Sequence, residues 1–493
     1  MDSFPDIDDI CTFNSKIEDF LMSDLILGFG KTGAAVYVYI KSRNDYAEKG
    51  RLLIYDDTAE NAGGLDVQDG NVMFFNKQNE EILFGRYFKD IERCVVSPGI
   101  PRNHHVILKL KSANIPVLSE IEFAYNNIQK EKNVKIIAIT GTNGKTTSVT
   151  LCKSAIEAAG LNGKTFVGGN LGVPFISGIG DYEDFILEVS SFQLEWIYDF
   201  KPDIAVLLNI KDDHLDRYLN FDEYRLTKYK MFKNLKYNDI AVLNQEDYNS
   251  SILKGVVGSN AVLYGFEEDK CDVFYRDGFI NLRLKDLLGF NAEISLKDVT
   301  DKRKFVIENM MAAACSLALY GIPPDVIKKA FDGYRLLKHR VECIGNIDNI
   351  YFYDDSKATN PSAVVSALGS FDASREDGVK TDTVLILGGK DKGFNYESIV
   401  EPLKKSVKAC VLMGETKEIL EKTLKGRVEY MLAGDMEDAV FKSYNYLKDT
   451  VKNGALGTVL LSPASSSFDM FKDYGERGDI FKKCFEKLKN NFL

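Results

Sequence analysis

The sequence predicts an α/β protein with parallel sheets that carry helices on both faces. Apolar strands followed by glycine turns and helical patterns recur at 25–33, 136–147, 384–389 and 459–464. This alternation is typical of parallel sheets whose ligands bind at the carboxyl ends of the strands. With 493 residues and about 150 residues per domain, we expect about three domains. Hydrophobic residues make up 45% of the chain and charged residues 27%, as in folded globular proteins.

Charge and composition exclude several classes of function. The chain has 62 Lys+Arg against 73 Asp+Glu, a net charge of −11, which disfavours general binding to nucleic acid or anionic membranes. No stretch reaches the roughly 20 apolar residues of a membrane span, and the acidic start MDSFPDIDDI lacks the features of a signal peptide. The eight cysteines are scattered, without the spacing of a metal or redox motif. We expect a reduced, cytoplasmic, monomeric protein.

Two polar stretches predict domain boundaries. Residues 129–133 (QKEKN) precede the second glycine unit, and residues 333–335 follow a helical pattern and precede a new strand. The predicted domains are therefore 1–131, 132–335 and 336–493. Between 255 and 300, short β-rich runs separated by turn residues indicate hairpins appended to the middle domain.

The segment IIAITGTNGKTTSVT at 136–150 is the most informative motif. A β-branched strand runs into a glycine loop, and a helical pattern follows that ends at Gly160. Glycines let backbone N–H groups and the helix N-terminus meet a phosphate chain. In this pattern Lys145 reaches the β- and γ-phosphates and the Thr146 hydroxyl binds Mg²⁺. The sequence therefore predicts a nucleotide-binding loop; the alternative is a plain strand–turn–helix.

A second glycine loop, GFGKTG at 28–33, follows the first strand, and Asp56 ends the strand RLLIYD. This pattern matches a dinucleotide-binding fingerprint with a ribose-binding acid. Three interpretations stay open: a dinucleotide, another nucleotide diphosphate, or only close packing of a helix on a strand.

Glu188 ends the strand pattern DFILEV, and His214 follows the strand pattern DIAVLLNI. Together with the Thr146 hydroxyl, they would converge on one cleft of a parallel sheet. Oxygen ligands with one imidazole suit Mg²⁺ or Mn²⁺ held against phosphates. The alternative is a surface carboxylate and a solvated loop histidine.

Three later loops carry Lys, Thr and Ser side chains. The loops DDSKATN (354–360) and GGKDKG (388–393) follow strands, and their Lys and Thr side chains suit a carboxylate or a phosphate. Helix capping and solvated charge are equally good interpretations. Ser465, Ser466 and Ser467 are expected at a helix N-terminus, as caps or as donors to an anion.

Taken together, these motifs resemble those of the Mur ligase family. The resemblance runs from about Leu25 to Phe481 and rests on ITGTNGKTT, GGNLGVP, LEVSSFQLE, NIKDDHLDRY, YRLTK, LKHRVE, DDSKATNP, GGKDKG and LSPASSSFDMFKDYGERG. The first few are shared with folylpolyglutamate synthases. The last motif, together with the GFGKTG start, is similar to the branch that adds D-glutamate.

The resemblance implies a Rossmann-like domain that binds UDP, a central P-loop ATPase domain, and a Rossmann-like C-terminal domain. It also implies an ATP-dependent ligase that joins D-glutamate to UDP-N-acetylmuramoyl-L-alanine through an acyl phosphate, in peptidoglycan synthesis. The alternatives are a ligase of the same superfamily with another amino acid or a folate acceptor, a P-loop switch protein, and a dinucleotide-dependent oxidoreductase.

The same resemblance implies the site residues. The UDP substrate would be bound by Gly30, Lys31, Thr32, Asp56, Ser97, Asn170 and His214. ATP would be bound by Gly141, Thr142, Asn143, Gly144, Lys145, Thr146, Thr147, Asn309, Arg340 and Asp355. D-Glutamate would be bound by Lys357, Thr359, Lys392, Ser467, Phe468 and Tyr474, the last at a position where Phe is more usual.

The implied metal ligands are Thr146, Glu188, His214 and Lys228. Lys228 would carry a carbamate derived from CO₂, and the implied catalytic residues are Lys145, His214 and Lys228. One departure from the family concerns Asn309. Many relatives have a G-x-H-N motif three residues before this asparagine, where the present chain has Arg303, Lys304, Phe305 and Val306.

Overall fold

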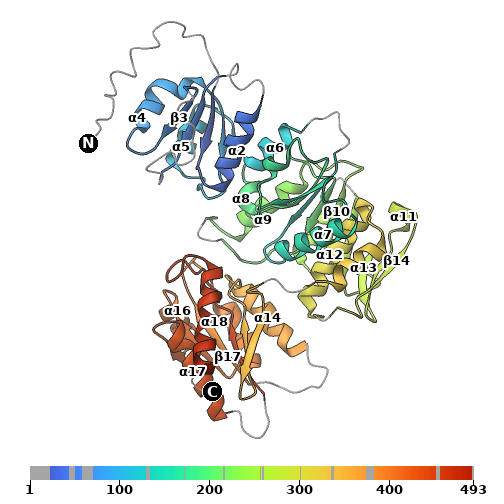
Figure 1. Ribbon diagram of the computed structural model, residues 1–493, viewed down its shortest axis with the longest axis vertical. Coiled ribbons are helices and arrows are strands. Elements are labelled where there is room, and N and C mark those ends of the chain that lie inside the picture. Colours follow the sequence, from blue (N-terminus) through green and yellow to red (C-terminus); the bar gives the residue numbers. More distant parts are fainter. Residues whose placement is uncertain are drawn as a thin grey trace. The chain divides into compact units, whose positions relative to one another are not determined.

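The structure is a computed structural model (Figure 1) that describes residues 23–43, 50–57, 70–128, 134–170, 172–214, 217–255, 257, 260–299, 301–334, 338–373, 382–450 and 456–490. It divides into two compact units. The first unit is Met1–Asn133, Gly168–Glu183 and Ser190–Phe200, and the second is Val134–Val167, Asp184–Val189 and Lys201–Leu493. The predicted linker 129–133, with the boundary at 131, and the predicted boundary at 335 lie outside the described residues.

The first unit is built on a parallel five-stranded sheet of order β3-β2-β1-β4-β5. The strands are β1 (Ser23–Leu27), β2 (Leu52–Tyr55), β3 (Val72–Phe75), β4 (Ile91–Val96) and β5 (Val117–Ser119). The helices are α2 (Lys31–Ser42), α4 (Glu80–Ile82), η1 (Leu83–Tyr87), η2 (Phe88–Asp90), α5 (His105–Ser112), α6 (Glu120–Asn126), η3 (Phe175–Gly178) and α8 (Ser191–Leu194). Trp196, from a distant segment, packs into the core of this sheet.

Carboxylates on α6 explain why 168–183 and 190–200 belong to the first unit. Glu122 accepts hydrogen bonds from the backbone N–H groups of Tyr198, Asp199 and Phe200 at 2.8–3.0 Å. Glu120 accepts one from the N–H of Ile176 at 2.7 Å. These buried charge-assisted bonds tie both segments to the helix.

The second unit contains a nine-stranded sheet of order β14-β13-β12-β11-β10-β9-β6-β8-β7. The strands are β6 (Ile136–Thr140), β7 (Thr165–Gly169), β8 (Asp184–Glu188), β9 (Ile204–Leu207), β10 (Ile240–Asn244), β11 (Asn260–Gly265), β12 (Val273–Arg276), β13 (Phe279–Leu282) and β14 (Ala292–Ser295). The predicted hairpins are confirmed for β12–β14, which pair antiparallel. The expectation of a hairpin was wrong for β11, which pairs parallel to β10 because helix α10 connects the two strands.

Helices of this unit are α7 (Lys145–Ala158), α9 (Phe221–Tyr229), η4 (Lys230–Phe232), α10 (Tyr248–Lys254), α11 (Lys285–Leu288), α12 (Lys304–Tyr320) and α13 (Pro324–Asp332). Helix α12 ends at Gly321, which lies at φ 113° and whose N–H donates to the carbonyl oxygens of Leu317 and Ala318. Only glycine adopts this backbone conformation without strain, which makes it a common helix stop.

A six-stranded sheet of order β15-β16-β20-β17-β18-β19 also lies in the second unit. The strands are β15 (Glu342–Ile347), β16 (Ile350–Asp354), β17 (Asp382–Gly388), β18 (Ala409–Met413), β19 (Tyr430–Leu432) and β20 (Gly457–Leu461), with only β15 antiparallel. The helices are α14 (Pro361–Ala373), α15 (Glu397–Ser406), α16 (Lys417–Leu424), α17 (Met436–Thr450) and α18 (Tyr474–Asn490).

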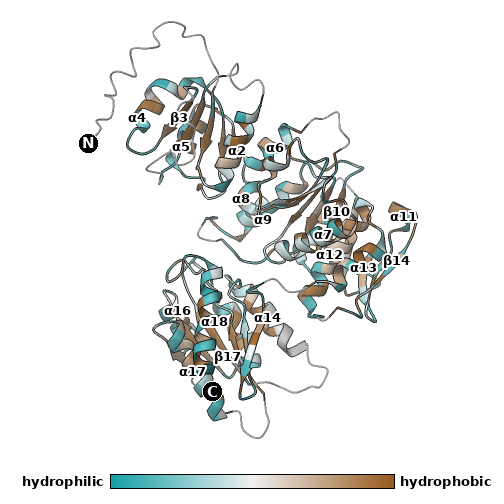
Figure 2. Cartoon of the chain, in the orientation of Figure 1, coloured by the Kyte–Doolittle hydropathy of each residue, from teal (hydrophilic) through white to brown (hydrophobic). Residues whose placement is uncertain are grey.

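The strands of this sheet are apolar on both faces, as the sequence pattern predicts. Along β17, Val384 and Ile386 belong to one hydrophobic cluster, and Leu385 and Leu387 belong to another. Figure 2 shows the strands as mainly hydrophobic. Burial on both faces is typical of parallel sheets covered by helices, so the predicted α/β fold class is confirmed.

No helix in the described ranges is long and apolar enough to cross a membrane. The seven cysteines that the structure describes are all free.

Candidate active site

The glycine loop between β6 and α7 is the centre of the site. Gly144, at φ 89°, precedes α7, and a Cβ at this position would clash with the Asn309 side chain. Asn143 N–H donates to Asn209 Oδ1 at 2.9 Å, and Thr142 Oγ1 lies 3.0 Å from Tyr224 Oη. The loop is therefore held from β9 and α9 while its glycines leave room for close approach.

Two lysines from different helices meet at one carbonyl oxygen of this loop. Lys145 Nζ donates to Gly141 O at 2.7 Å and to Thr142 O at 2.8 Å, and Lys228 Nζ donates to Gly141 O at 3.1 Å. Burial lowers the pKa of both ammonium groups, and their mutual repulsion lowers the pKa of Lys228 further. The arrangement concentrates positive charge where a polyphosphate would bind.

Glu188 and Thr146 are buried beside these lysines, with Glu188 at the end of β8. His214 lies at φ 55° after β9, and burial lowers its pKa to about 4, which keeps the imidazole neutral and able to bind a metal. Carboxylate, hydroxyl and imidazole suit Mg²⁺ or Mn²⁺. An unmodified Lys228 ammonium does not fit this set, because it would repel the cation; a carbamate on Lys228 would supply an oxygen ligand instead.

A cavity of about 590 Å³ begins at Asn143 and Gly144 of the glycine loop. Its wall includes Lys211, Glu308 and Asn309 from the region of the nine-stranded sheet. It also includes residues just before β15 and just after β16. Phe305 also lines it. Desolvation raises the pKa of Glu308 to about 7. A cavity of this size with a few polar groups is suited to a small organic ligand.

Two further predicted nucleotide ligands, Asp355 and Arg340, lie in the wall of this cavity. Asp355 accepts hydrogen bonds from Ser462 Oγ at 2.7 Å and from the Val341 N–H at 3.2 Å, and burial raises its pKa to about 7. Arg340 Nε is buried without a hydrogen-bond partner among the described residues. A buried donor left unbonded is costly, so an anionic group of a ligand would complete the environment of Arg340.

The predicted amino-acid ligands lie on loops around the third sheet, except Tyr474, which is the first residue of α18. Lys357 Nζ donates to Tyr474 Oη at 3.2 Å, and burial lowers the pKa of Lys357 to about 8. Thr359 N–H donates to Lys357 O at 2.9 Å, and Ser467 is buried, whereas Phe468 is 69% exposed. Lys392 is half-buried, and its positive charge helps to lower the pKa of His214.

The expectation for the three serines was wrong. Ser465, Ser466 and Ser467 lie in a loop after β20, and the following helix, α18, begins only at Tyr474. The loop is held across the sheet edge, because Lys390 N–H donates to Ser466 O at 2.8 Å.

The predicted UDP ligands lie in the first unit, except His214. Asp56 Oδ2 accepts from the Phe29 N–H at 2.6 Å, and Ser97 Oγ donates to Gly28 O at 2.7 Å, so both side chains shape the glycine loop. Gly30 precedes α2, whose first residues, Lys31 and Thr32, reach the surface. Asn170 is exposed in another segment of this unit.

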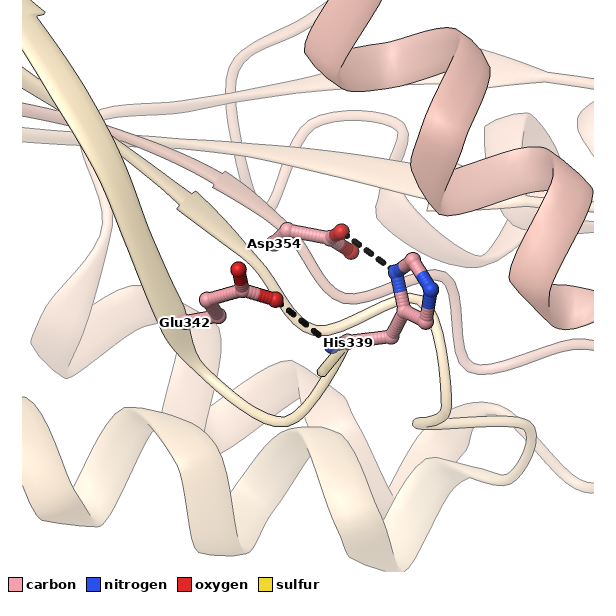
Figure 3. A group of neighbouring side chains, drawn as sticks. All are labelled: His339, Glu342 and Asp354. Atoms are coloured by element: carbon pink, nitrogen blue, oxygen red, sulfur yellow. Dashed lines mark hydrogen bonds and ion pairs between the residues drawn. The ribbon is translucent and has the colours of Figure 1, made fainter. Parts of the chain in front are cut away.

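Among the described residues, one group of three side chains has metal-like spacing: His339, Glu342 and Asp354 (Figure 3). His339 Nδ1 is 2.7 Å from Asp354 Oδ2, and the His339 N–H donates to Glu342 Oε2 at 2.9 Å. Lys482 Nζ lies 2.9 Å from Glu342 and 3.6 Å from Asp354. The ammonium of Lys482 therefore occupies the place of a cation beside the two carboxylates. We interpret this group as a set of structural contacts and not as a metal site.

Sequence reasoning missed the residues that brace the site. Asn209 and Tyr224 hold the glycine loop, and Asn360 Nδ2 donates to Asp213 Oδ2 at 3.1 Å. Asn209 could have been noticed, because it is an amide that interrupts the apolar strand pattern DIAVLLNI. Nothing in the local sequence pairs Asp213 with Asn360, which are far apart in the chain.

The fold and the site define a P-loop nucleotide-binding protein with parallel sheets. Residues 139–317 match the model of the Mur ligase middle domain, and residues 339–464 match the Mur ligase, glutamate ligase domain. A relative from Geotalea daltonii, named UDP-N-acetylmuramoylalanine--D-glutamate ligase, is 35% identical over 94% of this chain and 97% of its own length. A Geotalea uraniireducens relative of the same name is 36% identical, with the same coverage of both chains. The chain therefore belongs to the Mur ligase family.

A solved structure supports the fold independently. The pseudomurein peptide ligase type C from Methanothermus fervidus is similar with a TM-score of 0.58 at 14% identity, over 95% of this chain and 100% of that chain.

Proposed function

We propose that the protein is an ATP-dependent ligase that adds D-glutamate to UDP-N-acetylmuramoyl-L-alanine in peptidoglycan precursor synthesis, acting as a cytoplasmic monomer. The observation that carries the proposal is the cavity whose wall includes Asn143 and Gly144 of the glycine loop, Arg340 and Asp355, because it combines a phosphate loop, a cation and a ribose acceptor. The relatives' name, at 35–36% identity over 94% of the chain, supplies the acceptor and the amino acid. The predicted division into three domains, at 131 and 335, belongs to the same proposal.

In the first step, an oxygen of the alanyl carboxylate attacks the γ-phosphorus of ATP, and ADP leaves with the bond electrons. Lys145 and Arg340 would bind the phosphates, and Asp355 the ribose hydroxyls. Phosphoryl transfer relies on positioning and on neutralising charge, which these side chains supply. Asn309 would contact the nucleotide beside Gly144.

In the second step, the amine of D-glutamate attacks the acyl carbon, phosphate leaves, and the amine loses a proton. Lys357, Thr359, Lys392, Ser467, Phe468 and Tyr474 would hold D-glutamate, with a lysine paired to its carboxylate. The glycine loop of the first unit, with Lys31, Thr32, Asp56, Ser97 and Asn170, would hold the UDP substrate.

Mg²⁺ or Mn²⁺ would be held by Thr146, Glu188, His214 and a carbamate on Lys228, and would offset the charge on the phosphates. The carbamate forms when the neutral Lys228 amine bonds to the carbon of CO₂ and releases a proton. The carbamate would place an oxygen anion beside the other proposed metal ligands.

The purified protein is expected to release phosphate from ATP only when UDP-N-acetylmuramoyl-L-alanine, D-glutamate and Mg²⁺ are all present. Omitting each in turn, with a coupled phosphate assay, tests this directly. L-Alanine and a folate acceptor serve as controls for related ligases, and NAD(P)H titration tests an oxidoreductase. Full turnover without D-glutamate would contradict the proposal.

Nucleotide affinity is expected to fall as the pH drops below about 7. The pKa of Asp355 is raised to about 7 by burial, so the carboxyl is protonated at lower pH and loses its strength as an acceptor for ribose hydroxyls. The loss approaches tenfold per pH unit, the limit for one titrating group. Binding of a non-hydrolysable ATP analogue measured from pH 5.5 to 8.5 checks this. Asp355→Asn should bind weakly with a flatter profile, and an equally steep profile in Asp355→Asn would refute the assignment.

A further inference from the structure

Arg477 is a fully buried arginine on the first turn of α18, with 1% of its surface exposed. Burying a guanidinium is costly unless its donors are satisfied. It lies three residues after Tyr474, one of the predicted amino-acid ligands.

Each nitrogen of the guanidinium donates to one of two separate loops. Nε donates to Ser356 Oγ at 2.9 Å, and Nη2 donates to Ser356 O at 2.7 Å. Nη1 donates to Ser465 O at 3.0 Å and to Ser466 O at 3.1 Å. One side chain therefore joins the 354–360 loop to the 462–468 loop.

The third loop, 388–393, bonds to Ser466 O, which is also an acceptor of Arg477. Lys390 N–H donates to Ser466 O at 2.8 Å, and a Cβ on Gly389 would clash with Ser466 O and lie 3.0 Å from Arg477 Nη1. Ser356 Oγ also donates to Tyr474 O at 2.7 Å, which fixes the start of α18. Each of these loops carries predicted amino-acid ligands: Lys357 and Thr359, Lys392, and Ser467 and Phe468.

The acceptors of Arg477 are three carbonyl oxygens and one hydroxyl, so hydrogen bonding leaves its positive charge unneutralised. Three carboxylates, Asp469, Asp354 and Asp355, interact electrostatically with this charge. Asp469 accepts from the Glu415 N–H, Asp354 bonds to His339, and Asp355 accepts from Ser462. Arg477 therefore acts on the loops through its hydrogen bonds to their carbonyl and hydroxyl oxygens. The planar fork of five donors is specific to arginine, and a lysine cannot bridge both loops with the same geometry.

We propose that Arg477 is a positioning residue for the amino-acid substrate, holding the three loops in the arrangement that binds a carboxylate-bearing amino acid. This inference rests on the proposed function for the identity of the substrate. The contacts of Arg477 are with the loops alone. Asp355, the predicted ribose ligand, lies next to Ser356 in one of these loops, but it is also held by Ser462 Oγ and the Val341 N–H. We therefore expect a larger effect on amino-acid binding than on nucleotide binding.

Arg477→Lys is the main test, because it keeps the charge and removes the bridge. We expect kcat/KM for D-glutamate to fall by about 10²-fold, the scale of a misplacement of about 1 Å in a binding site, mainly through KM. The Kd of an ATP analogue, measured by fluorescence without D-glutamate, should stay within about twofold of the wild-type value. A twofold change in Kd is a small difference in binding free energy. Arg427→Lys is the matched control, since Arg427 is a surface arginine paired with Glu397 and should leave both values unchanged.

Hydrogen–deuterium exchange gives a readout that does not depend on turnover. In Arg477→Lys, backbone exchange should speed up in all three loops, while β17 and β18 keep their protection. Unchanged exchange, or an equal loss of ATP and D-glutamate binding in a folded variant, would overturn the inference.

If the wild-type protein shows no D-glutamate-dependent turnover, the proposed function fails and exchange still decides the role of Arg477. If Arg477→Lys does not fold, Ser356→Ala is the second variant, because it removes one acceptor of Arg477 and the hydrogen bond to Tyr474 O. We expect this variant to raise the KM for D-glutamate, and an unchanged KM refutes the inference.

Discussion

Lys145→Ala is expected to reduce ligase turnover by at least about 10²–10³-fold, the effect of removing one preorganised charge donor from a transition state. Lys145 Nζ rests on the carbonyls of Gly141 and Thr142, at the start of α7. These two bonds hold the ammonium on the loop that would surround the phosphates. When a γ-phosphate arrives, it can replace the carbonyls as the acceptor, because a charged acceptor bonds more strongly than a neutral one.

Steady-state phosphate release measures this loss, and binding of an ATP analogue shows how much of it is ground-state affinity. Lys153→Ala is the matched control. Lys153 lies on the same helix, and its exposed ammonium forms only a long surface ion pair with Glu157, at 3.9 Å. A surface pair of this kind contributes little, so the control should retain full activity. Activity of Lys145→Ala near that of the control would exclude the loop as the phosphate site.

The glycine loop was predictable because its signal is local. A β-branched strand, Gly141, Gly144, Lys145 and the helix pattern follow one another in the sequence, and both interpretations of this pattern place a strand, a turn and a helix here. The end of α12 at Gly321 also has a local signal, because glycine is a common helix stop. The order of strands in each sheet was not, because pairing between distant strands leaves no local pattern.

The contacts that complete the site are long-range. Lys228 reaches Gly141 across 87 positions, and Arg477 reaches Ser356 across 121. Neither helix pattern distinguishes these residues from surface cations. The serines at 465–467 were placed wrongly because a run of serines resembles a helix cap, whereas here β20 and Arg477 hold them in a loop.

Lys228→Ala is expected to lose activity on the same scale as Lys145→Ala, and short carboxylates such as formate or acetate should restore part of it. Lys228 is 1% exposed and donates to the Gly141 oxygen that Lys145 also binds. Burial and the neighbouring Lys145 lower the pKa of Lys228, so its amine can react with CO₂, and the resulting carbamate would offer oxygen ligands to Mg²⁺. A free carboxylate diffusing into the space left by the lysine can supply the same oxygen atoms.

Activity with and without added carboxylate, at fixed ATP and D-glutamate, measures the rescue. Lys233→Ala, an exposed lysine beyond the same helix, is the control and should neither lose activity nor respond to carboxylate. A carbamate signal in the ¹³C spectrum of the wild-type protein supplied with labelled CO₂, absent in Lys228→Ala, reports the modification without turnover. Full activity of the unsupplemented variant would show that the buried ammonium is only a structural partner of the loop. A carbamate would add a second carboxylate-like ligand to the set of Thr146, Glu188 and His214, which suits a Mg²⁺ that binds substrate phosphates.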